Sequence, residues 1–512
     1  MPARDLTTGP IGRTLFVFAL PILGGNALQS MNGSVNAIWV GRFLGENALS
    51  AIANANNIMF LLLGGVFGFG MASTILVGQA MGRKDLPGAR KVIGTAATFF
   101  LGIAIVLAAL GLPLSRHLLV WMSTPAAALP LADAYLKIIF LALPFLYAFA
   151  FLSAILRGAG DTRTPFLFLL LAVLLDIGLV PMLMFGWGPF PVMGMAGSAM
   201  ATLVANAIAL AALLGWLRHE RHPLWIGRGE RHLYRPDWTI VRTLVTKGVP
   251  MGLQMVLISL AMITMISMVN RYGTLTTAAY GAALQLWTYV QMPAMAIGAA
   301  CSSMAAQNVG AGRWERVEAT ARSGVGFNFL LTGALIVPLL LLDRFTLSMF
   351  LPDGSAALEI ARHLNHIAVW SFLFFGVTFV IAGVVRATGA VLPPLLILGF
   401  ALWGIRVPFA TLLQPVLGAD AIWWSFPVSA ACAMAMQLAY YRWGGWRSSR
   451  MLATDPHVQA IPSEVPGQVP SPVADPCMPP PAVQPGPSGT RHTAPTTGGL
   501  PGPGAAGGSL RG

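Results

Sequence analysis

Long apolar stretches alternate with short polar, glycine- or proline-containing turns along most of the chain. A window of about 19 residues finds about twelve apolar segments long enough to cross a bilayer. Because backbone groups in lipid need internal partners, and barrel strands would be about half as long, these segments are predicted to be helices. They lie near residues 14–40, 48–78, 90–112, 132–155, 164–186, 194–217, 239–270, 277–305, 321–343, 358–383, 391–415 and 419–441. The pattern therefore predicts an all-α integral membrane protein.

Composition supports this prediction. The 512 residues are 56% hydrophobic and only 10% charged, whereas a soluble domain carries roughly 25% charged residues. The mean hydropathy is +0.71. The first segment is not a short apolar core followed by a small-residue cleavage site, so we expect a retained span and not a signal peptide.

The basic residues predict the orientation in the membrane. If the N-terminus is inside, about 22 Lys and Arg residues fall on the cytoplasmic side and about five on the other, as the positive-inside rule requires. The net charge of +13 is then explained by topology, and we expect no nucleic-acid partner. The chain is predicted to be a multi-pass protein of the plasma membrane, the inner membrane of a bacterium, with both termini in the cytoplasm.

The last part of the chain differs in composition from the rest. Residues 447–512 are rich in Pro, Gly, Ser and Thr, which cannot form a packed core and predicts a disordered cytoplasmic tail. The three cysteines, Cys301, Cys432 and Cys477, have neither a disulfide framework nor metal-ligand spacing. We expect no metal and no cofactor.

The second half of the chain repeats landmarks of the first half in the same order and at a nearly constant offset. "GQAMGRKD" at 78–85 aligns with "AQNVGAGR" at 306–313, and "LRGAGDTRTP" at 156–165 aligns with "VRATGAVLPP" at 385–394. These landmarks predict an N-terminal six-helix lobe at 1–228 and a C-terminal six-helix lobe at 229–446, joined by a charged cytoplasmic linker at 218–247. Two halves of this kind are typical of transporters, with the substrate site between them and access alternating between the two membrane sides.

At these landmarks the sequence resembles the multidrug and toxic compound extrusion (MATE) family. The motifs include "ALPILGGNALQSMNGSVNAIWVGR" at 19–42, "ILRGAGDTRTP" at 155–165 and "AAQNVGAGRWERVEATAR" at 305–322. The resemblance covers residues 19–410. It implies two pseudo-symmetric lobes around a V-shaped central cavity, and cation-coupled antiport of small organic, mostly cationic or amphipathic, drugs and metabolites. It also implies a protein that is not an enzyme, and we expect a monomer.

The resemblance is closer to the DinF-like branch of the family than to the NorM-like branch. In the DinF-like branch an acid follows the proline of the first helix by about four helical turns, and Asn36 occupies that place here. The fifth helix of that branch has an asparagine and an acid where this chain has Asp176 and Val180. The acids of the NorM-like branch are absent as well, since Ile258 and Phe375 stand at their places.

Asp176 is the only carboxylate near the middle of a predicted span. An aspartate at that depth costs about 2.5–3.5 kcal/mol on insertion scales, so it is expected to be functional. We predict a relocated cation-coupling site formed by Asp176, Asn36 and Ser198. Proton coupling is favoured over sodium because Asn36 and Ser198 supply few further oxygen ligands. The alternatives are a structural hydrogen-bonding role for Asp176, or pairing with Arg406, which lies at nearly the equivalent place in the second half.

Weaker candidates for the substrate cavity come from three segments. The polar residues Asn54 and Asn57 of the second predicted span serve helix packing at least as often as ligand binding. An aromatic and thioether-containing stripe on the eighth span suits flat organic cations. The candidates are Asn54, Asn57, Gln285, Trp287, Tyr289, Met292 and Arg406.

Other functions are weighed against this hypothesis. A flippase for lipid-linked precursors should have a more cationic cavity than Lys137 and Arg406 provide. A major-facilitator transporter lacks the repeated glutamine-glycine loop. A membrane enzyme needs a nucleophile-base set within the membrane, and none is evident. A membrane scaffold that recruits partners through its tail would not need the duplicated core.

Overall fold

The computed structural model describes residues 5–122, 124–187, 190–352 and 354–452. Helices make up nearly all of this part of the chain. The first half contains α1 (Ile11–Leu44), α2 (Glu46–Gly82), α3 (Leu86–Trp121), α4 (Leu129–Gly158), α5 (Arg163–Phe185) and α6 (Met195–His219). After the 3-10 helix η1 (Arg228–Tyr234), the second half contains α7 (Trp238–Asn270), α8 (Thr274–Gly310), α9 (Trp314–Leu341), α10 (Asp343–Ser348), α11 (Ala356–Ala368), α12 (Ser371–Arg386), α13 (Leu392–Gly399), η2 (Phe400–Arg406), α14 (Val407–Leu412), α15 (Gln414–Leu417) and α16 (Asp420–Trp443).

Each of the twelve predicted segments coincides with a helix or a broken helix. Ten described helices or helical segments are long and apolar enough to cross a membrane, and α11 with α12 forms an eleventh span bent by 42°. The helix at the remaining predicted segment, α8, is not among these ten, but it has 37 residues and no charged side chain, so it is long enough to be the twelfth span. The all-α membrane fold predicted from the pattern is confirmed.

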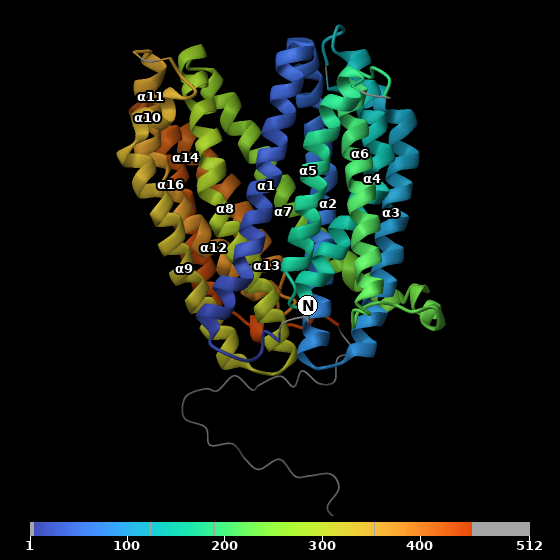
Figure 1. Cartoon of the computed structure of the whole chain (residues 1–512). Helices are drawn as coiled ribbons and strands as arrows, with labels where there is room; N and C mark the ends of the chain where they lie inside the picture. The colour runs from blue at the N-terminus through green and yellow to red at the C-terminus, as the bar shows by residue number, and fades with distance from the viewer. Residues whose placement is uncertain (1–4, 123, 188–189, 353, 453–512) are drawn as a thin grey trace, which may run out of the picture. The chain divides into compact units, whose positions relative to one another are not determined.

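The helices form two groups, which we call lobe 1 (α1–α6) and lobe 2 (α7–α16). Within lobe 1, α4 packs against α2, α3 and α6, and α5 packs against α1 and α6. Within lobe 2, α12 packs against α8, α9 and α16. The lobes meet along α1 and α2 of one and α7, α8 and α9 of the other. Figure 1 shows α1, α2 and α7 in the middle of the bundle.

The lobe boundary between 228 and 229 stays a prediction, because Met1–Ile461 forms one compact unit. Within the predicted linker 218–247, α6 ends at His219 and α7 begins at Trp238. The described chain continues past the predicted start of the tail at 447 to Leu452 and buries Met451. Residues 453–512 lie outside the described part.

One end of the bundle carries most of the basic residues. We call it the basic end and define it by the N-terminal segment 5–10 and the connections 83–85, 159–162, 220–237, 311–313, 387–391 and 444–452. Ion pairs bind the linker to the start of α3 there, with 2.7 Å between Arg90 Nη1 and Glu230 Oε1 and 2.6 Å between Lys91 Nζ and Asp237 Oδ2.

Candidate functional site

Asp176 lies inside lobe 1, where α5 meets α1 and α6. Its side chain is only 2% exposed, and each carboxylate oxygen accepts one hydrogen bond. Asn32 Nδ2 of α1 donates to Oδ2 at 2.8 Å, and Thr202 Oγ1 of α6 donates to Oδ1 at 3.0 Å. A buried carboxylate is costly unless it is paired or hydrogen-bonded. The two donors offset part of that cost and hold the carboxylate in one orientation.

Small residues bring the three helices close enough for these contacts. A Cβ at Gly24 of α1 would lie 2.9 Å from the Phe166 ring of α5, and a Cβ at Gly197 of α6 would lie 2.5 Å from the Leu183 carbonyl oxygen of α5. Side chains at either position would push the helices apart. The glycines therefore allow a short aspartate on α5 to reach partners on both neighbouring helices.

The polar residues of lobe 1 form two layers, one helical turn apart. In the first, Ser198 Oγ donates to Asn36 Oδ1 at 2.7 Å, and the neighbouring position on α5 is the buried Val180. The second layer is Asn32, Asp176 and Thr202. Each of its members is four residues from its counterpart in the first layer, and residues four apart share a helix face.

The predicted trio is thus divided between the layers. Asn36 and Ser198 bond to each other, and Asp176 bonds to Asn32 and Thr202, which the sequence analysis missed. Their spacing was the available signal, since Asn32 precedes Asn36 by one turn and Thr202 follows Ser198 by one turn. Among the described residues Asp176 forms no ion pair, so it is not paired with Arg406 in this structure.

Arg406 lies inside lobe 2, at the end of the π-helical turn η2. Its Nε donates to Ser429 Oγ of α16 at 2.9 Å, and its guanidinium carbon lies 4.6 Å from the centre of the Phe426 ring. Counted from the basic end, Asp176 and Arg406 stand at almost the same position along their spans, Arg163–Phe185 and Leu392–Leu412. Both are therefore roughly 20 Å along their spans at about 1.5 Å per residue.

The predicted stripe on α8 contains both buried and exposed side chains. Trp287 is 3% exposed and donates from Nε1 to Asn365 Oδ1 at 2.9 Å, so it packs within lobe 2. Met292 is also buried, whereas Gln285 and Tyr289 are exposed. Asn54 and Asn57 belong to α2, but their side chains lie outside the described residues.

Two glutamines join the lobes at the basic end by matching hydrogen bonds. Gln79 Nε2 of lobe 1 donates to the Ala387 carbonyl of lobe 2 at 2.7 Å, and Gln307 Nε2 of lobe 2 donates to the Gly158 carbonyl of lobe 1 at 2.9 Å. Both glutamines are buried. The sequence repeat pairs Gln79 with Gln307 and Gly158 with Ala387, so the two bonds are equivalents. We call this pair of bonds the glutamine latch.

Close backbone packing surrounds the glutamine latch. A Cβ at Gly82 would overlap the backbone of Gln307, and a Cβ at Gly310 would overlap the backbone of Gln79. The N-terminal segment adds a further layer, because Leu6 is fully buried and its backbone N–H donates to Gln307 Oε1 at 3.0 Å. The bonds from Gln79, Gln307 and Leu6 therefore hold the two lobes in close contact at the basic end.

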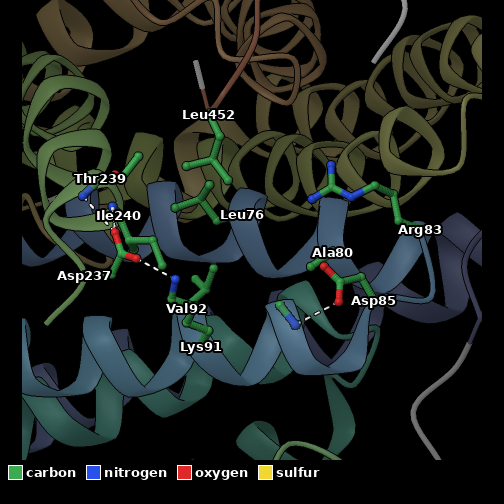
Figure 2. Close-up of a pocket in the computed structure, with 11 residues that line it drawn as sticks. Leu76, Ala80, Arg83, Asp85, Lys91, Val92, Asp237, Thr239, Ile240 and Leu452 are labelled. Carbon is green, nitrogen blue, oxygen red and sulfur yellow. Dashed lines mark hydrogen bonds and ion pairs between the residues drawn. The ribbon is translucent and has the colours of Figure 1, made fainter. Parts of the chain in front are cut away.

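A cavity of about 340 Å³ lies beside the latch, between α2, α3 and the start of α7. Figure 2 shows its charged side chains, with Lys91 bonded to Asp237 and Asp85 directed at the start of α3. The hydrogen bond from Lys91 is the main cause that lowers the pKa of Asp237. Because these groups already serve as an ion pair and helix caps, we assign the cavity a structural role.

Comparison with known proteins agrees with this geometry. The MatE family model matches residues 21–182 and again 250–412. The chain belongs to the MatE family. Two relatives from Bacillus subtilis are similar over most of their length: the probable multidrug resistance protein YoeA, 36% identical over 84% of this chain and 94% of the relative, and the probable multidrug resistance protein YpnP, 33% identical over 88% and 99%. A solved structure described as the outward-facing conformation of a multidrug resistance MATE family transporter superposes with a TM-score of 0.80 at 19% identity, covering 86% of this chain and 98% of that one.

The two MatE matches confirm the repeat and align its halves. They begin at Pro21 and Pro250, which are separated by nearly the same offset as the repeated motifs. Measured from these starts, Asp176 in the first match and Arg406 in the second fall at almost the same position. As a MatE protein the chain is a multi-pass membrane transporter and not an enzyme. Its halves carry a carboxylate and a guanidinium at nearly the same place in the MatE pattern.

Proposed function

We propose that this MatE transporter exports small organic compounds, cationic or amphipathic, in exchange for protons, and that Asp176 carries the proton. It acts as a monomer in the bacterial inner membrane, with the basic end and both termini in the cytoplasm. The positive-inside rule supports this orientation. The names of the Bacillus subtilis relatives, probable multidrug resistance proteins, support drug export.

The observation that carries the proposal is the environment of the Asp176 carboxylate. It is buried, it has no basic partner among the described residues, and two neutral donors hold it. Such a group can be neutralised by one proton without breaking an ion pair. Intramembrane carboxylates of this kind mark proton relays.

Sodium coupling is less well supported by the same contacts. Sodium needs several oxygen ligands, but Asn32 turns its amide nitrogen toward Asp176, and the Asn36 amide oxygen accepts from Ser198. Groups that donate hydrogen bonds to a carboxylate compete with a metal ion for it.

The test is transport of a fluorescent cationic dye by purified protein in proteoliposomes, with a pH gradient and a sodium gradient imposed separately. We expect the pH gradient to drive transport and Asp176→Asn to abolish the dependence on it. The matched control is Asp133→Asn, which also removes a hydrogen-bonded carboxylate from a span, beside Ser115 and Lys137. If only the sodium gradient drives dye transport, proton coupling is overturned. If the dye is transported without either gradient, antiport is overturned.

A further inference from the structure

Arg406 is held in place by two contacts that occupy only part of its guanidinium group. The Nε–H donates to Ser429, and the face of the group lies over Phe426. Ser429 and Phe426 are three residues apart on α16, so they form one surface against which the arginine rests. This surface fixes the direction of the side chain.

The surface is itself rigid. The Phe426 ring contacts the rings of Tyr280 and Trp287 of α8, with centroids 6.4 and 5.4 Å apart. Tyr280 and Trp287 are almost fully buried, and Ser429 is 1% exposed. Arg406 also ends a π-helical turn, a rare feature in spans that is frequent at functional sites. The position of the guanidinium is therefore built by three helical elements.

The two terminal nitrogens, Nη1 and Nη2, have no hydrogen bond or ion pair with any described residue. Arg386, the other arginine deep in lobe 2, offers a comparison. Arg386 is 1% exposed, and its Nη1 donates one hydrogen bond to Gln254 Oε1 at 2.7 Å, while its Nε and Nη2 are buried without a partner. Arg406 is instead partly exposed, and its unpaired terminal nitrogens are not fully buried.

An accessible arginine within a membrane span needs a counter-ion, because a charge at that depth costs about 2.5–3.5 kcal/mol on insertion scales. No carboxylate among the described residues pairs with it. The free edge of a fixed guanidinium presents two parallel N–H donors, which match the two oxygens of a carboxylate.

We propose that Arg406 binds the carboxylate of those amphipathic organic substrates that carry one, and so determines how strongly this transporter distinguishes a free carboxylate from its ester. The inference rests on the proposed drug-export function and names one residue that sets its specificity. In this arrangement lobe 1 handles the proton at Asp176, and lobe 2 recognises the anionic group of the substrate at Arg406.

The test uses two probes that differ by one group: a zwitterionic rhodamine with a free carboxylate, and the methyl ester of the same rhodamine. Binding to purified protein in detergent is measured first by fluorescence anisotropy, without any gradient. We expect Arg406→Gln and Arg406→Lys to weaken binding of the free carboxylate by about tenfold or more, since bidentate charged hydrogen bonds are lost. Binding of the ester should change by less than about twofold.

A second variant keeps the charge and removes only its support. Ser429→Ala frees Nε and loosens the side chain, so it should weaken binding of the carboxylate probe by a smaller factor and leave the ester unchanged. It also keeps the test decisive if substitutions at Arg406 fail to fold. The matched control is Ser425→Ala, one turn away on the same helix, whose hydroxyl donates only to the Ile422 carbonyl.

The outcomes separate this inference from the proposed function. Equal losses for both probes would mean that Arg406 only supports the fold, and no loss for either would mean that it does not contact the carboxylate; each overturns the inference. Transport of the two probes in proteoliposomes then tests coupling. If neither gradient drives the ester while Arg406 still discriminates the probes in detergent, the proton-antiport proposal fails and the inference stands.

Discussion

The two halves of this transporter are alike at the basic end and different in the middle of the membrane. At the basic end each half contributes one glutamine, one carbonyl acceptor and one glycine, and the resulting contacts mirror each other. About 20 Å further along the spans, the equivalent places hold Asp176 in lobe 1 and Arg406 in lobe 2. Closing an interface between two similar lobes requires matching surfaces on both, whereas binding a proton requires only one carboxylate. The repeat is therefore retained where the lobes touch, and it is lost at the two positions to which we assign different ligands in the proposals above.

The largest expected effect separates the two mid-membrane residues. Asp176→Asn should reduce pH-gradient-driven transport of a cationic dye at least tenfold, because the amide cannot carry a proton. Arg406→Gln should leave the pH dependence for that dye in place, because this arginine acts on substrates with a carboxylate. The measurement is initial transport rate against the size of the imposed pH gradient. Equal loss of pH dependence in both variants would mean that the halves share one function.

A second effect tests the symmetry of the glutamine latch. Gln79→Leu and Gln307→Leu each leave a buried carbonyl without its donor, which costs about 1–3 kcal/mol. Gln307→Leu also removes the acceptor of the Leu6 N–H, so we expect both variants to open the basic end, and Gln307→Leu at least as much as Gln79→Leu. The measurement is labelling of a cysteine placed at the buried Thr388, in a background that lacks the native cysteines. Opening by only one of the two variants would show that the matching bonds are unequal in energy.

A smaller effect concerns the donors to Asp176. Thr202→Val and Asn32→Ala each remove a hydrogen bond that favours the ionised carboxylate, so proton release should slow and transport should fall severalfold. Thr202→Val keeps the shape of the side chain, which makes it the cleaner variant. The control is Ser198→Ala, which breaks only the bond to Asn36. If Ser198→Ala were the more harmful change, the coupling site would be the first layer and not the second.

The smallest effect lies at the end opposite the latch, in lobe 2. Burial alone would raise the pKa of Asp343, but hydrogen bonds from His366 and Arg362 outweigh it, and the pKa is lowered. A lowered pKa stabilises the fold above the unfolded value of about 3.9, and this stability is lost as the pH falls through the folded value. Asp343→Asn should therefore lower the Tm near pH 7 but not near pH 3. The exposed Glu359→Gln is the control, and an equal Tm loss at both pH values would contradict the prediction.

Much of the fold follows from local patterns. Apolar runs of spanning length predicted the helices, since a backbone in lipid has few other ways to satisfy its hydrogen bonds. The boundaries of α5, 164–186 against the observed Arg163–Phe185, agree closely because a proline follows the start and a glycine follows the end. The broken span of α11 and α12 and the π-helical turn at Arg406 were not predictable, because neither bend has a distinct signal in composition.

The site divides in the same way between sequence and structure. The sequence by itself determined that one carboxylate and one arginine stand at equivalent depths of a duplicated membrane protein, because the distance along the chain from each span start sets the depth. Only the tertiary structure decided their partners. Asn32 and Thr202 reach Asp176 because glycines let α1 and α6 approach α5, and Trp287 turns into lobe 2 because Asn365 accepts its N–H. Which face of a helix meets which neighbour depends on close packing between segments far apart in the chain, and no single segment contains that information.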